Sequence, residues 1–194
     1  MNKDIMIDIE TMGRTPDAVI TAIAAARFDI MTGIIDDEFY EVVDWKRQPG
    51  RVIEPDTVSW WMEQDRAARE EFSKPGLNLD LTLECLARFI ERDDMENNEI
   101  IWVNNPEFDI SILTHAYYNV PMRSALYDAS PPWKFWNIRD CRTLRAVAKE
   151  IVNHKDFERG EKHNALEDVR YQIRYVSAMW LALKDQGPNI KRGE

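Results

Sequence analysis

Four acidic residues and one histidine stand in three short motifs whose side chains could carry out metal-assisted hydrolysis. In chain order the motifs are Asp8-Ile9-Glu10-Thr11, Asn105-Pro106-Glu107-Phe108-Asp109 and His163-Asn164-Ala165-Leu166-Glu167-Asp168. Hard divalent cations prefer oxygen ligands, and two such cations beside a base can activate water against a phosphodiester bond. The candidate catalytic residues are therefore Asp8, Glu10, Asp109, His163 and Asp168.

The first motif lies at the end of a predicted strand over residues 4–10. Because successive side chains of a strand point to opposite faces, three isoleucines share one face while Met6, Asp8 and Glu10 share the other. Two carboxylates on an apolar strand repel each other unless a positive charge lies between them, and a bound cation supplies that charge. The D-x-E spacing also occurs, in surroundings that indicate solvated surface, at Asp36/Glu38, Asp94/Glu96 and Asp156/Glu158.

The second motif follows an apolar run at residues 99–103 that predicts another strand. Asn105 is the expected N-cap and Pro106 the first residue of a helix over 106–118. Asp109 then falls in the first helical turn, just beyond a strand end, where ligands tend to bind in open α/β sheets. The alternative is that Asp109 only complements the helix dipole.

The third motif begins a predicted helix over residues 164–185, with Asn164 and Glu167 spaced as a capping box. Asp168 falls in its first turn, where the helix dipole favours a carboxylate. His163 and Asp168 are roughly 140° apart on a helix of 3.6 residues per turn, so His163 is predicted to lie in the preceding loop. An imidazole titrates near neutral pH, which makes His163 the candidate general base.

Hydrophobic periodicity predicts a mixed sheet with helices packed on it, an α/β fold. Strands are expected near 4–10, 18–29, 34–44, 99–103 and 135–139, and helices from residue 55 and over 79–92, 106–118, 141–152 and 164–185. The length of 194 residues fits one domain over 1–185, followed by a frayed tail at 186–194.

The composition is acidic, with a formal net charge of −10. This balance disfavours a non-specific duplex binder, whereas a protein that grips a few terminal nucleotides needs fewer basic contacts. No stretch approaches the length of a membrane span, and the apolar run at 18–26 has the flanks of a buried strand and not of a signal sequence. A cytoplasmic location and no membrane partner are expected.

The chain has seven tryptophans, many for its length. Trp102 and Trp180 fall on apolar patterns and are predicted to pack in the core. An aromatic side chain beside a nuclease site can stack on a base, and exposed tryptophans also accumulate at dimer interfaces. Both interpretations apply to Trp60, Trp61, Trp133, Phe135 and Trp136.

The three motifs together resemble the signatures of the DEDDh branch of the DnaQ-like 3′–5′ exonuclease superfamily, D-x-E-[TS], N-x-x-[FY]-D and H-x-A-x-x-D. A narrower branch, with phage exodeoxyribonuclease A and related bacterial exoribonucleases, is similar at two further places: Trp60-Trp61 before Gln64, and Arg139-Asp140 before Arg142-Thr143-Leu144. The resemblance implies an RNase H-like (DnaQ-like) mixed central β-sheet flanked by helices. It also implies release of nucleoside 5′-monophosphates from the 3′ ends of single-stranded DNA or RNA.

The resemblance further implies two divalent cations, Mg²⁺ or Mn²⁺. Asp8, Glu10 and Asp168 would hold one cation, and Asp8, with Asp109 acting through water, would hold the other. His163 would take the proton from the attacking water. The expected substrate-binding residues are Thr11, Met12, Gly13, Trp61, Asn105 and Trp136. A homodimer would fit the related enzymes.

Two other functions are consistent with parts of the sequence. One is a catalytically inactive nuclease-fold module that binds nucleic acid or protein, against which the intact acids and the intact His163 argue. The other is a nuclease of a different fold, because Asp44-Trp45-Lys46 imitates a D-x-K motif. That tripeptide leaves Asp109 and His163 unexplained.

Overall fold

The computed structural model describes residues 4–91, 99–120 and 130–185, and the described strands form one five-stranded sheet in the order β3-β2-β1-β4-β5. β1 is central and pairs antiparallel with β2 on one side and parallel with β4 on the other. β3 pairs antiparallel with β2, and β5 pairs parallel with β4. The strands are β1 (Asp4–Thr11), β2 (Ile20–Phe28), β3 (Ile35–Val42), β4 (Ile100–Val103) and β5 (Ile138–Asp140).

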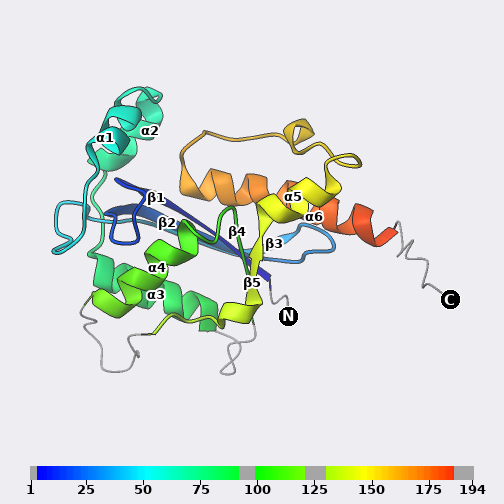
Figure 1. The fold of residues 1–194 in the computed structure, drawn as a ribbon, viewed down its shortest axis with the longest axis horizontal. Coiled ribbons are helices and arrows are strands. Elements are labelled where there is room, and N and C mark those ends of the chain that lie inside the picture. Colours follow the sequence, from blue (N-terminus) through cyan, green and yellow to red (C-terminus); the bar gives the residue numbers. More distant parts are fainter. Residues whose placement is uncertain (1–3, 92–98, 121–129, 186–194) are drawn as a thin grey trace.

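Helices cover both faces of the sheet, α3 and α4 on one and α5 and α6 on the other (Figure 1). The helices are α1 (Pro55–Met62), α2 (Arg66–Glu70), α3 (Leu79–Glu91), α4 (Asp109–Asn119), α5 (Cys141–Ala148) and α6 (Ala165–Asp185). The predicted α/β fold with a mixed sheet flanked by helices is confirmed. None of the helices in the described ranges is long and apolar enough to cross a membrane.

The alternation predicted for β1 is confirmed. Ile5, Ile7 and Ile9 pack in the core beneath α3 and α4, whereas Met6 packs in the core beneath α6. Asp8 therefore points toward α6. Alternate alanines of β2 face the same helix and let α6 lie close to the sheet, and all nine residues of β2 are buried, as expected for this strand.

Several element boundaries differ from those predicted. Asn105 begins a turn and not the helix: its carbonyl accepts from the N–H groups of Phe108 and Asp109, and its Oδ1 accepts from the N–H of Glu107. α4 consequently begins at Asp109 and not at Pro106. α5 ends at Ala148, short of the predicted 152, and β5 is preceded by a 3₁₀ turn at Phe135–Asn137.

Two expectations lie wholly or partly outside the described residues. The tail at 186–194 and the D-x-E pair Asp94/Glu96 belong to ranges that the structure does not describe. The other two D-x-E pairs are solvated, as predicted, because Asp36, Glu38, Asp156 and Glu158 are all exposed.

Candidate active site

A cavity of about 660 Å³ lies at the carboxyl end of β1, and all five candidate catalytic residues line it. The topology explains this convergence. β1 and β4 are parallel neighbours, so the end of β1 and the turn that follows β4 meet at one edge of the sheet. The first turn of α6 closes the site from the face on which Asp8 and Glu10 project.

Asp8 and Asp109 are held in place by hydrogen bonds. The Nε2 group of Gln172, one turn beyond Asp168 on α6, donates to Asp8 Oδ1 at 2.8 Å. Asp109 is 3% exposed, and its Oδ2 accepts from the backbone N–H of Asn105 at 3.0 Å. Both carboxylates are thus oriented by the protein before any ligand binds.

The predicted start of α6 is confirmed. The N–H of Glu167 donates to Asn164 Oδ1 at 3.2 Å, and Asp168 lies in the first helical turn. His163 lies in the preceding loop, with a φ of +63°. Its ring contacts Trp60 and Trp61 edge to face, with ring centroids 4.8 Å and 5.9 Å away. The two tryptophans therefore set the position of the imidazole.

The residues of the site fit a divalent cation. Glu10, His163 and Asp168 each offer one ligand atom, and these atoms lie within 4.8 Å of one another. Burial, followed by the nearby carboxylates, raises the pKa of Asp8 and of Glu10 well above their usual values. Burial raises the pKa of Asp109 to about 7. Buried carboxylates that repel one another are the donor set that a cation relieves.

The imidazole of His163 is shifted in the opposite direction. Burial lowers the pKa of His163 below its usual value, although the nearby Asp168 raises it in part. This shift favours the neutral ring, whose lone pair can accept a proton.

The structure places the predicted substrate-binding residues in two groups. Thr11, Gly13, Trp61 and Asn105 line the cavity, whereas Met12 and Trp136 do not. Met12 instead packs in a small buried cluster with Trp61. Trp136 precedes β5, which runs parallel to β1, so it lies at the amino end of its strand and away from the site.

The aromatic candidates for base stacking separate clearly. Trp61 is 3% exposed, and its Nε1 donates to the carbonyl of Thr11 at 2.9 Å, so it supports the end of β1. Trp133 is also buried, and Phe135 and Trp136 are exposed but outside the cavity. Trp60, 42% exposed at the cavity, has the surface that stacking requires.

Sequence reasoning missed several residues that shape the site, some in the cavity wall and one, Gln172, behind Asp8. Gln172 could have been found, because it lies four residues after Asp168 and therefore on the same face of α6. Arg159 lies in an irregular segment, and no spacing places it near Asp168. The cavity also includes Arg14 and Arg142, which add positive charge around the acidic centre.

The five-stranded mixed sheet flanked by helices, with acidic side chains at the end of its central strand, is the fold expected of the DnaQ-like, RNase H-fold nucleases. A family model described as "3′–5′ exoribonuclease Rv2179c-like domain" matches residues 3–180, and the chain belongs to this family of 3′–5′ exonucleases. The predicted resemblance is confirmed. The exodeoxyribonuclease of Enterobacteria phage T4 is 27% identical over 159 residues, covering 72% of this chain and 69% of that protein.

Solved nuclease structures share the fold. A structure of exonuclease I matches 95% of this chain with a TM-score of 0.63 and 18% identity. E. coli exonuclease I in complex with a dA16 oligonucleotide also matches 95% of this chain, with a TM-score of 0.61 and 19% identity. Cell-death related nuclease 4 matches 95% of this chain and 64% of its own chain, with a TM-score of 0.53 and 10% identity. The chain spans 41% of the length of both exonuclease I chains.

Without cations, the site should make the protein less stable as the pH rises. The folded state keeps protons on its raised-pKa carboxyls that the unfolded chain has already released, so stability falls between about pH 4 and pH 7. We expect the melting temperature of wild type in EDTA to decline over this range, and the melting temperature of Asp109→Asn to decline less. Differential scanning fluorimetry from pH 5 to pH 8 measures both. Parallel curves for the two proteins would contradict the assignment of a raised pKa to Asp109.

Gln172 should affect cation binding through Asp8. Gln172→Leu removes the donor that orients Asp8, and a lost partner of this kind typically lowers metal affinity or activity by about 10–100-fold. Calorimetric titration with Mn²⁺ measures the effect. Ser177→Ala, on the buried face of the same helix but outside the cavity, is the matched control and should bind Mn²⁺ as wild type does.

Proposed function

We propose that this protein hydrolyses single-stranded nucleic acid from the 3′ end with two divalent cations, Mg²⁺ or Mn²⁺, and releases nucleoside 5′-monophosphates. The observation that carries the proposal is the convergence of four carboxylates and one imidazole in a single cavity. Asp8, Glu10, Asp109 and Asp168 would hold the cations. When bound, the cations polarise the phosphate and lower the pKa of a water molecule.

The protein's own groups perform the remaining steps. His163 accepts the proton of the attacking water, because burial favours its neutral ring and the tryptophan contacts fix its direction. Asn105 and Gln172 keep Asp109 and Asp8 oriented throughout. This pre-organisation lowers the reorganisation that the reaction requires.

The cavity also suits the end of a strand. Its volume of about 660 Å³ falls within the usual range of small-molecule sites, about 300–1,000 Å³, so it accommodates terminal nucleotides and not a duplex. Arg14, Arg142 and Arg159 give local positive charge for phosphates despite the net charge of −10. Trp60 offers an exposed ring for stacking on a base.

Product analysis tests this function. A short single-stranded oligonucleotide is incubated with the protein and Mg²⁺ or Mn²⁺, and the products are separated by liquid chromatography. We expect nucleoside 5′-monophosphates to accumulate from the earliest times. Nucleoside 3′-monophosphates, or oligonucleotide fragments alone, would contradict the proposal.

Relatives point to both sugars. The family is named after an exoribonuclease domain, whereas the phage relative is named an exodeoxyribonuclease. One exonuclease I structure contains a dA16 oligonucleotide. DNA and RNA of the same sequence therefore belong side by side in the assay.

A further inference from the structure

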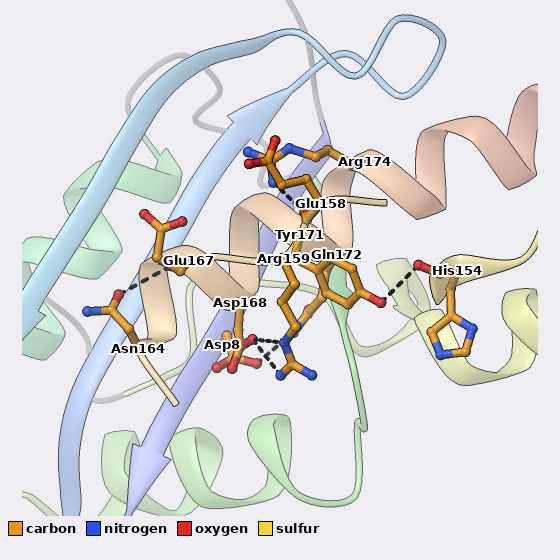
Figure 2. Close-up of polar contacts among 10 residues, drawn as sticks. All are labelled: Asp8, His154, Glu158, Arg159, Asn164, Glu167, Asp168, Tyr171, Gln172 and Arg174. Atoms are coloured by element: carbon orange, nitrogen blue, oxygen red, sulfur yellow. Dashed lines mark hydrogen bonds and ion pairs between the residues drawn. The ribbon is translucent and has the colours of Figure 1, made fainter. Parts of the chain in front are cut away.

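Arg159 is bound to one of the carboxylates that the proposed function assigns to a cation. Its Nη2 and Nε groups both donate to Asp168 Oδ1, at 2.8 Å and 3.2 Å. The guanidinium also lies close enough to lower the pKa of Glu10. One arginine thus supplies positive charge to two buried or half-buried acids where a cation is expected, as Figure 2 shows for Asp168.

A cation and this ion pair compete for Asp168. A divalent ion held by Glu10 and Asp168 would lie beside a guanidinium that already occupies one oxygen of Asp168. The carboxylate of Asp168 is buried although the Arg159 side chain is 38% exposed, and two positive charges a few ångströms apart on one such carboxylate repel each other. Cation binding therefore weakens or breaks the bond between Arg159 and Asp168.

The loop that carries Arg159 is anchored independently of Asp168. Arg174 donates to the carbonyl of Glu158 at 2.7 Å, and the hydroxyl of Tyr171 donates to the carbonyl of His154 at 2.9 Å (Figure 2). The guanidinium of Arg159 also lies 5.2 Å from the centre of the Tyr171 ring. A released Arg159 consequently stays at the wall of the cavity, where the phosphate of a substrate would lie.

We propose that Arg159 exchanges partners, binding Asp168 in the cation-free protein and a phosphate oxygen of the nucleic acid once a cation has taken Asp168. The planar fork of arginine matches carboxylate and phosphate alike, so one side chain suits both partners. The proposal rests on the proposed function for the identity of the cation and the phosphate. It makes Arg159 a substrate-binding residue whose availability depends on the cation.

Two measurements on Arg159→Gln test the exchange. In a Mn²⁺ titration without nucleic acid, the variant should bind the ion at least about fivefold more tightly than wild type, because a competing positive charge is gone. Its affinity for a fluorescent single-stranded oligonucleotide, measured by anisotropy with Mn²⁺ in a His163→Ala background, should fall about tenfold or more. Melting curves confirm that each variant is folded.

Two further variants separate the exchange from other effects. Arg174→Gln, also in the His163→Ala background for the anisotropy, removes one anchor of the same loop and leaves the Tyr171 contacts to His154 and Arg159 in place. Because Arg174 does not contact Asp168, both affinities should stay unchanged. Arg159→Lys keeps the charge but loses the fork, so Mn²⁺ affinity should return toward that of wild type while oligonucleotide affinity stays reduced.

Either half of the exchange can fail by itself. Unchanged Mn²⁺ affinity in Arg159→Gln would show that no competition exists, and unchanged oligonucleotide affinity would remove the phosphate contact. Arg174→Gln reproducing both effects would assign them to loop order. Each of these results overturns the proposal. Failure of wild type to release nucleotides would instead contradict the proposed function, and both titrations remain readable in that case because neither requires turnover.

Discussion

Asp8→Asn should lower the turnover of single-stranded substrates by more than about 100-fold, a larger loss than the 10–100-fold typical of residues that only support a metal ligand. Asp8 lies on the central strand, is 9% exposed, and has three other carboxylates close enough to raise its pKa. It is the one acid that both proposed cations share. The amide keeps the size of the side chain and removes its charge, so the loss reports on cation binding and not on packing.

Calorimetry on the same variant makes this result specific. Mn²⁺ should bind Asp8→Asn far more weakly. Its melting temperature in EDTA at pH 7 should equal or exceed that of wild type, because the amide removes the cost of burying a carboxyl whose pKa folding raises. Asp36→Asn, at an exposed D-x-E pair, is the matched control and should behave as wild type. Full turnover by Asp8→Asn would remove the metal assignment altogether.

His163→Ala should lower kcat by about 10²–10⁴-fold, the range that general acid–base catalysis supplies. The loss should depend on pH. The rate of wild type should rise as the pH increases through the pKa of His163, because the imidazole then loses its proton. Burial lowers this pKa, so the rise should occur below the usual pKa of a histidine. At lower pH the protonated ring cannot accept the proton of the water.

The pH profile decides whether His163 acts as the base. His163→Ala should be flat where wild type rises, and His115→Ala, outside the cavity, should keep the rise. A rising limb that persists in His163→Ala would assign it to another group. His163 would then serve only to position the water or a cation.

Motif spacing predicted where the five candidate residues lie, because each motif sits at a defined point of an element. Alternation along β1 puts Asp8 and Glu10 on one face, the capping residue Asn164 places Asp168 in the first turn of α6, and His163 must then precede the helix. Strand alternation and helix capping depend on neighbouring residues, so both can be predicted from the sequence. The resemblance then supplied the roles of these residues.

Features that depend on tertiary packing were not predictable. Arg159 reaches Asp168 from an irregular segment whose path is set by its bonds to α6. Of the adjacent Trp60 and Trp61, the sequence could not say which is buried, because this depends on where α1 docks against the end of β1. The late start of α4 follows from the turn at Asn105, whose carbonyl accepts from the N–H groups of Phe108 and Asp109.

A gel time course tests the central claim most directly. It uses 5′-labelled single-stranded DNA and RNA of one sequence with Mg²⁺ or Mn²⁺, beside EDTA and Asp8→Asn controls. We expect a ladder that shortens from the 3′ end, absent in both controls, with the faster substrate identifying the preferred sugar. Internal cuts without a ladder, a ladder that survives in either control, or no cleavage of DNA and RNA with both metals would contradict a metal-dependent 3′–5′ exonuclease built on these residues.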